Sequence, residues 1–343
     1  MKIVHIINNL EIGGGAQALV KDIIKYGKYD HKVITLEKPS LHFAEIEQLS
    51  LLRNPIKSIN HIFNSDLIHF HLFPSLYLAP IFFLKKKIFT EHNTFNRRRK
   101  YKIFKYIDSF FYSFFIKIFC ISDGTKKTLS DWLIGKYFTS KFEVIYNGVD
   151  FSAFKKNDNR FSNSRKKYHN NENIVIGMVG SFTDQKNQKF LLEVLADLPI
   201  NYSLRFAGSG KTFESIQNYS NQICLKDRVQ FCGLISDIPS FYDDLDIYVH
   251  AAHWEGFGLT IIEAIASGLP VLASNVSGLK EIIEPSYLFN NDDKSNLVKL
   301  IENIFIDKKL IDLENLYKNS KEAFDITIMV KKYESQYKLI KNG

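Results

Sequence analysis

Apolar residues along the chain form short runs typical of buried strands, separated by longer amphipathic stretches typical of helices. Short runs predict strands at Lys2–Ile7, Lys32–Leu36, Leu67–Phe70 and Lys87–Thr90 in the first half of the chain. The segment Ala16–Tyr26 predicts a helix between the first two strands. Strands that alternate with helices in this way indicate an α/β protein with parallel sheets.

The same alternation returns after a polar segment at residues 152–173. This segment is repetitive in Asn, Lys, Arg and Ser, which predicts a linker. Beyond it, further strands are predicted at Ile174–Val179, Ile247–Val249 and Val271–Ala273, and the tail from about Lys294 to Lys341 has a charged amphipathic helical pattern. A chain of 343 residues is long for one domain and natural for two of about 150 residues each.

The most informative stretch is residues 246–283. After the strand at its start, Gly256 and Gly258 allow a tight loop, and Leu259–Ala266 has the apolar density of a buried helix that Pro270 cannot continue. A further strand follows, so the stretch is a βαβ unit. A loop between a strand's carboxyl end and a helix N-terminus is where open α/β sheets bind ligands, and the helix N-terminus favours phosphate.

Two carboxylates accompany this predicted phosphate site. Glu255 lies in the glycine loop, and Glu263 lies about one and a half turns into the helix. Carboxylates are unsuited to an anion and better suited to accepting hydrogen bonds from hydroxyl groups. A phosphate flanked by polyols describes a nucleotide sugar. The alternative is that Glu255 is a surface loop acid and that Glu263 belongs to a solvated helix face.

The segment HWEGFGLTIIEAIASGLPVLAS, with seven residues between Glu255 and Glu263, resembles the signature of the retaining GT-B glycosyltransferases of family 4, also called group 1. The string VIYNGVDF at 144–151 resembles the last strand of the family's first domain. The resemblance implies the GT-B fold, in which two doubly wound Rossmann-like α/β domains face each other across a cleft. Its implied parts are an acceptor-binding domain at 1–151, a linker at 152–173, a nucleotide-sugar-binding domain at 174–324, and a helix at 325–343 that crosses back to the first domain.

A lysine follows the first strand of the predicted second domain. The loop Gly180–Asn187 leads into a helix from about Gln188, and a lysine just before a helix is well placed to hold a diphosphate. The family commonly has GR…QKN here, and Lys186 matches its phosphate lysine. Ser181 stands where the family usually has Arg, which puts one expected phosphate contact in doubt. The alternative for Lys186 is a solvated lysine at a helix start.

The resemblance implies catalytic roles for Lys186, Glu255 and His92, because His92 directly follows a strand and resembles the family's catalytic-domain histidine. The implied donor-binding residues are Gly14, Gly15, Ser181, Gly208, Gly210, Leu234, Gly256, Phe257, Gly258, Leu259 and Glu263.

Three other motifs are weak. Residues 13–18 formally fit a dinucleotide fingerprint with Glu37 as the ribose acid, but the glycines come several residues after the strand, which disfavours a nicotinamide enzyme. The GSGKT string at 208–212 lacks the first glycine of a P-loop, since Arg205 stands there. The Asp244–Asp246 pair has the DxD pattern of some metal-dependent glycosyltransferases, but it begins a buried strand and is interpreted as structural.

Histidines cluster near the third and fourth predicted strands. We expect His69 and His71 to point to opposite faces of their strand, so that at most one lines a cleft. No acidic cluster accompanies these histidines, so we predict no metal site and no cofactor. His92, at a strand end, is the better candidate for the active site.

The net charge of +8 is unevenly distributed. Residues 1–150 contain 22 Lys and Arg against 13 Asp and Glu, a balance of +9, and the remainder contains 23 against 24, a balance of −1. This asymmetry indicates an anionic partner of the first half.

The basic run Arg97–Lys100 precedes an aromatic stripe at helical spacing, formed by Phe104, Ile107, Phe111, Phe114, Phe115 and Ile118. The stripe suits either a crossover helix packed on the core or a helix on an anionic membrane surface. We favour peripheral contact of residues 97–120 with the inner membrane face. Because no nucleic-acid-binding motif is present, we expect no nucleic-acid partner.

The three cysteines are an odd number without a CxxC pair, which disfavours a disulfide framework and indicates a reducing compartment. The apolar run at the start is too short for a signal peptide. We therefore expect a cytoplasmic protein, in part at the inner face of the cell membrane.

The resemblance implies a metal-independent hexosyl- or N-acetylhexosaminyltransferase that uses a nucleotide-sugar donor, with a UDP-sugar favoured by its frequency in the family. The implied acceptor is a glycan or lipid-linked glycan in surface polysaccharide biosynthesis. No side chain is an obvious base, and such retaining enzymes are thought to use the leaving phosphate. The alternatives are a GT-B nucleotide-sugar 2-epimerase and a catalytically silent nucleotide-sugar-binding subunit, for which Ser181 is the only support.

Overall fold

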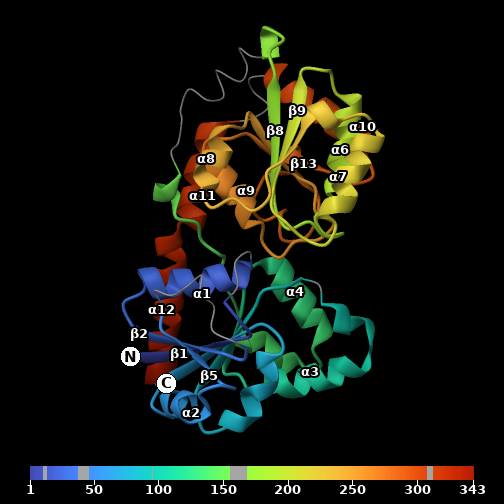
Figure 1. Ribbon diagram of the computed structural model, residues 1–343. Coiled ribbons are helices and arrows are strands. Elements are labelled where there is room, and N and C mark those ends of the chain that lie inside the picture. Colours follow the sequence, from blue (N-terminus) through green and yellow to red (C-terminus); the bar gives the residue numbers. More distant parts are fainter. Residues whose placement is uncertain (11–13, 38–45, 95, 155–167, 307–311) are drawn as a thin grey trace. The chain divides into compact units, whose positions relative to one another are not determined.

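The computed structural model describes the whole chain except residues 11–13, 38–45, 95, 155–167 and 307–311. The chain forms two compact units (Figure 1). The first contains Met1–Gly148 together with Ile326–Gly343, and the second contains Val149–Asp325. Most of the predicted linker at 152–173 lies outside the described residues.

The first unit is built on a parallel sheet whose described strands run in the order β3-β2-β1-β4-β5-β6-β7. The strands are β1 (Lys2–Ile7), β2 (Asp30–Thr35), β3 (Gln48–Ser50), β4 (Leu67–His71), β5 (Lys87–Glu91), β6 (Lys117–Cys120) and β7 (Phe142–Val144). The helices are α1 (Gly15–Tyr26), α2 (Pro55–Phe63), α3 (Ile103–Ser113), α4 (Asp123–Trp132) and α12 (Ile326–Asn342), with 3-10 helices η2 (Ser75–Phe82), η3 (Arg97–Lys100) and η4 (Lys136–Lys141).

The second unit repeats this plan with the strand order β10-β9-β8-β11-β12-β13, again all parallel. The strands are β8 (Ile174–Val179), β9 (Tyr202–Ala207), β10 (Val229–Phe231), β11 (Ile247–His250), β12 (Val271–Ser274) and β13 (Leu288–Phe289). The helices are α6 (Gln188–Asp197), α7 (Phe213–Gln222), α8 (Ile238–Asp243), α9 (Leu259–Ala266), α10 (Lys294–Ile306) and α11 (Leu313–Phe324), with 3-10 helices η5 (Phe151–Ala153), η6 (Lys226–Arg228) and η7 (Pro285–Tyr287).

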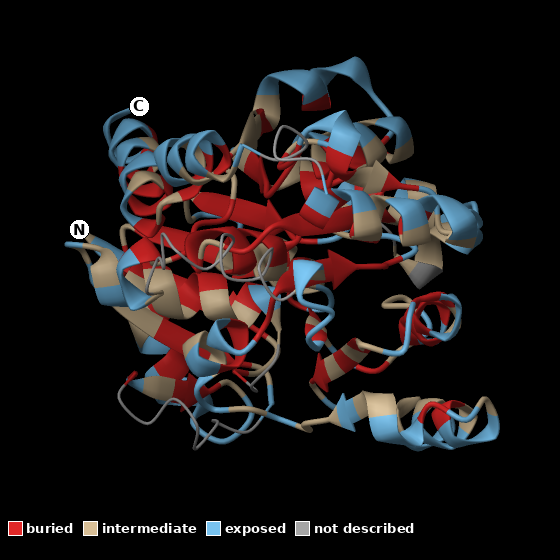
Figure 2. Cartoon of the chain, turned by 90° about the horizontal axis from the view of Figure 1, so that it is seen from above, coloured by how far each residue is buried: buried red, intermediate tan, exposed pale blue. Residues whose placement is uncertain are grey.

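The sheet of the first unit is covered on both faces, which is why its strands are apolar runs without clear alternation. Figure 2 shows the strands buried and the outer faces of the helices exposed. On one face, side chains of β1 such as Val4 and Ile6 join a core with residues of α2, η2 and α3. On the other face, Ile3 and Leu67 pack with α1 and with α12, whose Tyr333 is fully buried. The last helix is therefore part of the first unit.

The aromatic stripe was predicted as one helix, and this prediction is wrong at its carboxyl end. α3 ends at Ser113, and Ile118 belongs to β6, which pairs with β5. A short apolar run is compatible with either a buried helix or a central strand, and periodicity alone cannot separate the two. Hydrogen bonding to a neighbouring strand decides the structure here.

The orientation predicted for two histidines is also wrong. His69 and His71 are two residues apart in β4, and side chains two apart in a strand lie on the same face. Their rings are 3.9 Å apart, centroid to centroid, on the face that α12 covers.

Candidate active site

The two side chains with the strongest prediction, Lys186 and Glu255, form an ion pair in the second unit. Lys186 lies in the loop after β8, and Glu255 lies in the loop after β11. These strands are neighbours, and the strand order along the sheet reverses between them. Ligands bind open α/β sheets beyond the carboxyl ends of the strands at such a reversal. The pair therefore lies where a ligand is expected.

Glycines shape the loops around this pair. Gly258 has φ of +85° and caps the N-terminus of α9, so the helix begins at once after the Glu255 loop. Gly208, after β9, has φ of +135°, and a Cβ there would lie 2.0 Å from the carbonyl oxygen of Gly180. Only glycine permits both backbones at this spacing. The loops after β8 and β9 are thereby held together at the edge of the sheet.

The Glu255 carboxylate is held in its charged form. Burial by itself raises the pKa of Glu255, but the charge of Lys186 and hydrogen bonds from His250 and Lys186 outweigh burial and hold that pKa far below its usual range. Both side chains of the pair are only 14% exposed. An ionised carboxylate is a hydrogen-bond acceptor only, so Glu255 is suited to a sugar hydroxyl and unsuited to general-acid catalysis.

His250 is a residue of this site that the sequence analysis missed. Its side chain is fully buried, and its Nε2 lies 3.1 Å from Glu255 Oε2, while its Nδ1 lies 3.2 Å from the hydroxyl of Tyr248. His250 therefore orients the Glu255 carboxylate through this hydrogen bond. The sequence feature that could have indicated His250 is its place as a polar residue at the end of an apolar strand, directly before the loop that contains Glu255.

Glu263 has a different environment from Glu255. The hydroxyl of Tyr242 in α8 lies 2.9 Å from Glu263 Oε2 and 3.0 Å from the carbonyl oxygen of Thr260. Burial raises the pKa of Glu263, and the hydrogen bond from Tyr242 offsets only part of this rise. No local sequence pattern links the two residues, because Tyr242 reaches Glu263 through the packing of α8 on α9.

The other predicted donor residues of the second unit lie in the same set of loops. Ser181 follows β8, Gly210 follows β9, and Leu234 follows β10, where it is 72% exposed. Phe257 differs, because its side chain is buried with its ring 5.5 Å from that of Phe324. A role in which the Phe257 side chain contacts the donor is therefore not supported by this position. Gly256 and Leu259 flank it in the turn that begins α9.

Three predicted residues belong to the first unit. Gly14 caps α1, which begins at Gly15, directly after the loop that follows β1. His92 directly follows β5 and is buried, with its Nε2 3.4 Å from Nδ1 of His71. All three lie at the carboxyl edge of the first parallel sheet. Burial lowers the pKa of His92 to about 3, so the imidazole is neutral at physiological pH.

The DxD pair has structural partners. Asp246 is buried, and its Oδ2 accepts a hydrogen bond from the backbone N–H of Val175 at 2.9 Å. Asp244 Oδ2 accepts one from Arg205 at 2.7 Å. These bonds tie β11 to β8 and β9, which accounts for the pair without a metal.

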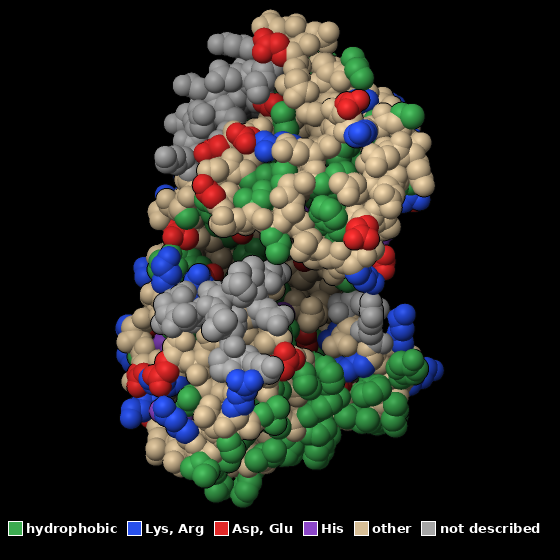
Figure 3. Space-filling view, in the orientation of Figure 1, with side chains coloured by type: hydrophobic (Ala, Val, Ile, Leu, Met, Phe, Trp, Pro, Cys, Tyr) green, Lys and Arg blue, Asp and Glu red, His purple; other side chains and the backbone are tan. Residues whose placement is uncertain are grey.

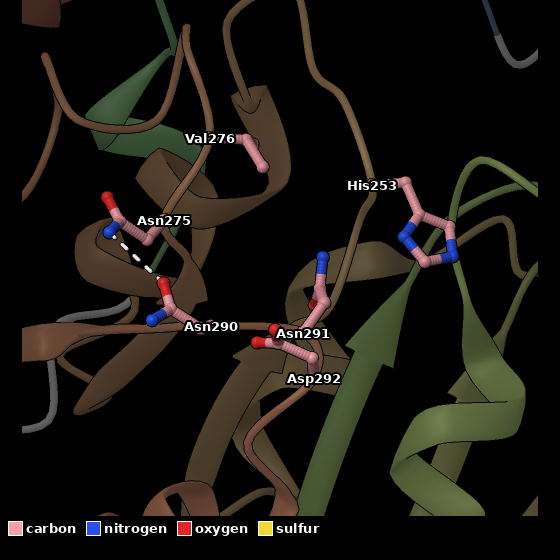
Figure 4. Close-up of a pocket in the computed structure, with 6 residues that line it drawn as sticks. All are labelled: His253, Asn275, Val276, Asn290, Asn291 and Asp292. Carbon is pink, nitrogen blue, oxygen red and sulfur yellow. Dashed lines mark hydrogen bonds between the residues drawn. The ribbon is translucent and has the colours of Figure 1, made fainter.

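A polar pocket of about 420 Å³ lies in the second unit at the ends of β12 and β13 (Figure 4). Asn275 donates a hydrogen bond to Asn290 Oδ1 at 3.2 Å on one side of it, and His253, from the loop that also contains Glu255, lies on the other side. Nδ2 of Asn291 is bonded to the Ala252 carbonyl, while its Oδ1 has no partner among the described residues. Carboxamides in a pocket provide both donors and acceptors, a set that suits hydroxyl groups.

One of the two parallel α/β units thus has a charged pair and a helix N-terminus at its topological switch point, where proteins with open α/β sheets bind ligands. The family models for "Glycosyl transferases group 1" and "Glycosyltransferase Family 4" match residues 159–323 and 22–153. The chain belongs to the GT-B glycosyltransferases of this group, and the recognition from the EGFG segment is confirmed. No helix in the described part of the chain is long and apolar enough to cross a membrane.

Curated relatives are similar along much of the chain. A Klebsiella pneumoniae protein described as an uncharacterised 41.2 kDa protein in the cps region is 25% identical, over 88% of this chain and 89% of its own. The Staphylococcus aureus capsular polysaccharide biosynthesis glycosyltransferase CapM is 29% identical, over 65% and 63%. The Escherichia coli UDP-Gal:alpha-D-GlcNAc-diphosphoundecaprenol alpha-1,3-galactosyltransferase is 28% identical, over 57% and 54%.

Solved structures confirm the fold. The Anabaena protein Alr3699/HepE, crystallised in complex with UDP and glucose, superposes with a TM-score of 0.84 at 20% identity, and the match covers 98% of this chain and 99% of HepE. The predicted GT-B fold of two Rossmann-like domains is thereby confirmed.

Proposed function

We propose that this enzyme is a retaining glycosyltransferase that moves a sugar from a UDP-sugar to a glycan or lipid-linked glycan during surface polysaccharide biosynthesis. The observation that carries the proposal is the Lys186–Glu255 pair at the switch point of the second sheet, beside the N-terminus of α9. The UDP bound to HepE supports the choice of nucleotide, and CapM and the diphosphoundecaprenol galactosyltransferase support the acceptor class.

Within this proposal, each chemical task of the transfer is assigned to a residue. Lys186 and the N-terminus of α9, which begins at Leu259, stabilise the charge that builds on the leaving diphosphate. Glu255, held by His250, accepts hydrogen bonds from the sugar hydroxyls, and Glu263 accepts them from the ribose.

The two units have different roles in the proposal. Residues 174–324 bind the nucleotide sugar, and residues 1–151 bind the acceptor, with His92, Gly14 and Gly15 on the acceptor side. Glu91, beside His92, accepts hydrogen bonds from the Tyr112 hydroxyl and the Asn93 backbone N–H. The alternative is 2-epimerisation, for which acid/base carboxylates from both domains are expected.

Incubation of the enzyme with UDP-hexoses and UDP-N-acetylhexosamines, a lipid-diphosphate glycan acceptor and EDTA tests this proposal. We expect free UDP, an extended acceptor with a retained anomeric configuration by NMR, and unchanged rates in EDTA because the proposed site uses Lys186 in place of a metal. Nucleotide that stays on an isomerised sugar would identify an epimerase. Activity that EDTA abolishes and manganese restores would overturn the metal-independent mechanism.

The first unit has an apolar surface that suits a membrane. α3 buries Asp108, which accepts a hydrogen bond from Trp132 at 2.9 Å, and exposes Ile103, Tyr106 and Phe110 by more than half. This helix is therefore polar on part of its buried side and apolar on its exposed side. Figure 3 shows apolar side chains gathered on this unit. The exposed side chains Ile103, Tyr106 and Phe110 are called here the α3 apolar surface, and further large apolar side chains that this unit exposes include Ile56, Ile81, Phe83, Leu84 and Tyr101.

We propose that the α3 apolar surface docks on the anionic inner face of the cell membrane. The exposed lysines Lys100 and Lys102 lie just before it in sequence, and residues 1–150 carry the entire positive excess of the chain. Apolar side chains next to basic ones are attracted to anionic lipid by both area burial and charge. This location would bring the first unit close to a lipid-linked acceptor.

Replacing Ile103 and Phe110 together by serine is expected to lower binding to vesicles that contain anionic phospholipid by at least ~10-fold, because a fully buried apolar side chain contributes about 1.5–3 kcal/mol. Vesicle flotation measures the partition. Ile200→Ser, at an exposed position of the second unit, is the matched control and should bind as the unaltered enzyme does. Equal flotation of all three proteins would exclude the α3 apolar surface as the membrane contact.

A further inference from the structure

The polar pocket at the ends of β12 and β13 contains none of the residues that the proposed function assigns to the nucleotide sugar (Figure 4). Its lining residues follow three neighbouring parallel strands of the second sheet, β11, β12 and β13. They are His253, Asn275, Val276, Asn290, Asn291 and Asp292. The pocket therefore lies at the carboxyl edge of the sheet, where open α/β sheets bind ligands, and its volume of about 420 Å³ is in the range of small-molecule sites.

Hydrogen bonds within the second unit fix one wall of this pocket. Nδ2 of Asn275 donates to Asn290 Oδ1 at 3.2 Å, and the Asn275 backbone N–H donates to the carbonyl oxygen of Phe289 at 2.7 Å. These two bonds join the loops that follow β12 and β13. Nδ2 of Asn291 donates to the carbonyl oxygen of Ala252 at 3.0 Å, which ties the same wall to the loop after β11. The wall is therefore built into the edge of the sheet and is formed before a ligand arrives.

The other side of the pocket is the loop after β11. The backbone N–H of His253 donates to the carbonyl oxygen of Gln185 at 2.8 Å, and Gln185 Nε2 donates to the carbonyl oxygen of Trp254 at 2.8 Å. These bonds hold His253 in place two residues before Glu255, so the reach of an extended chain keeps their Cα atoms within about 7 Å of each other. The pocket therefore adjoins the loop that contains Glu255, although Glu255 does not line it.

Polar groups on both sides of the pocket are left over for a ligand. The side chains of His253, Asn275, Asn290 and Asp292 are exposed. Asn275 and Asn290 use one polar atom each on one another, which leaves Asn275 Oδ1 and Asn290 Nδ2. The Asp292 carboxylate and the ring nitrogens of His253 make no hydrogen bond or ion pair with the described residues. The pocket thus presents acceptors and donors together, and a hydroxyl group can use both.

The charge of the pocket disfavours anionic ligands. None of the described residues that line it is Lys or Arg, and Asp292 carries a negative charge. A divalent cation is the competing ligand, but Ca²⁺ takes about six to eight oxygen ligands. The lining has a single carboxylate, and the neighbouring Asp293 already accepts a hydrogen bond from the Asn296 backbone N–H at 2.9 Å. Carboxamides around the apolar side chain of Val276 instead suit a ring with hydroxyl groups at its edge and C–H groups on its face.

We propose that this pocket binds one uncharged pyranose unit of a glycan chain, separate from the sugar unit that the enzyme transfers. The choice of a glycan rests on the proposed function, because the chain that is extended is the polyol that such an enzyme meets. The site lies wholly within the second unit, to which the proposed function gives the nucleotide sugar. A glycan held there stays at a high effective concentration, which favours rebinding of the same chain after each transfer.

Binding of free trisaccharides to the enzyme tests the pocket without any transfer. Maltotriose and triacetylchitotriose, both uncharged, are titrated calorimetrically to millimolar concentration in EDTA, and at least one is expected to bind. Replacing Asn290 and Asp292 together by alanine is expected to raise its Kd by about tenfold or more, because two hydrogen-bonding side chains are lost. The matched control replaces Asn221 and Asp227 by alanine, which are also exposed and in the second unit but come before β10, at the other edge of the sheet. Its Kd should stay within about twofold.

Binding of UDP and UDP-sugars to the same variants supplies a second readout. Their Kd should be unchanged when Asn290 and Asp292 are replaced, because the pocket lies outside the proposed donor site. The glycan pocket would be overturned if neither trisaccharide bound the unaltered enzyme, or if the pocket variant bound as tightly as the unaltered enzyme. Trisaccharide binding that needs a metal ion would assign the pocket to a cation, and a loss of UDP-sugar binding alone would assign it to the donor; either result also overturns the proposal. Trisaccharide binding in the pocket without any sugar transfer would instead overturn the proposed function and leave the pocket in place.

Discussion

Replacing Lys186 by alanine is expected to lower kcat by about 100- to 1000-fold, the usual loss when one preorganised group that stabilises developing charge is removed. Lys186 is the charged partner of Glu255 at the switch point, and in the proposed mechanism it meets the diphosphate as its negative charge grows. Glu255→Gln should show a loss of similar size, since the neutral amide no longer attracts Lys186 or accepts as strongly from sugar hydroxyls.

Steady-state kinetics with a UDP-sugar, together with UDP titration calorimetry, measure these losses. Lys189→Ala is the control, because Lys189 is the next lysine along the chain, lies in α6 and is exposed, with Glu193 as its partner at 3.8 Å. Its rate should stay close to that of the unaltered enzyme. Circular dichroism checks folding, because Lys186→Ala removes the cation that faces the shielded Glu255 carboxylate. A folded Lys186→Ala enzyme with near-normal kcat would refute the role given to Lys186.

Acid is expected to unfold the first unit at a pH well above the range where most carboxylates titrate. Burial lowers the pKa of each of five histidines in this unit, with neighbouring histidines adding to the effect for His5, His69 and His71. His92 is lowered to about 3 and His31 to about 4, although Glu334 and Asp30 raise the latter in part.

The direction of this pH dependence follows from proton uptake by the unfolded chain. Above pH 6.5 these histidines are neutral in both the folded and the unfolded state. Below pH 6.5 they bind protons in the unfolded chain but not in the folded unit, so the free energy of unfolding falls as the pH falls. At pH 5.5 each of these histidines lowers the free energy of unfolding by about 1.4 kcal/mol, and the five together lower it by about 7 kcal/mol. This loss is comparable to the roughly 5–15 kcal/mol stability of a typical domain. The loss continues until the pH reaches the folded-state pKa values.

Urea unfolding of the enzyme between pH 8 and pH 5 tests this expectation. The second unit is the internal control, because it contributes His250 to this effect, whereas the first unit contributes five histidines whose pKa burial lowers. The two units should therefore unfold together or nearly so at pH 8 and separately below pH 6, with the first unit less stable. A free energy of unfolding of the first unit that stays constant from pH 8 to pH 5.5 would contradict the neutral, buried state of the cluster.

Local sequence patterns accounted for much of the second unit. β8 was predicted at Ile174–Val179 and α9 at Leu259–Ala266, and both have these bounds in the structure. Central strands of a parallel sheet are continuous apolar runs, and Gly258 and Gly268 mark the two ends of the helix between two such strands. The residues that predict each element therefore lie within it or a few positions away. The fold class followed from this alternation.

Side-chain pairings between distant segments depended on the tertiary structure. Lys186 and Glu255 are 69 residues apart, and their ion pair exists because β8 and β11 are neighbours in the sheet. The contact between Tyr242 and Glu263 arises from helix packing in the same way. The local pattern of apolar residues does not predict which strands are neighbours in the sheet. The sequence therefore supplied candidate site residues, and the strand order decided which of them are in contact.

By itself, then, the sequence of this protein determined its α/β class, the glycine loop with its two carboxylates and the family to which the EGFG segment belongs, because each depends on residues close together in the chain. Only the tertiary structure decided that Ile118 is in a strand, that His250 supports Glu255, and that histidines from four strands form one buried cluster. These features depend on hydrogen bonds and packing between segments that are far apart in the chain.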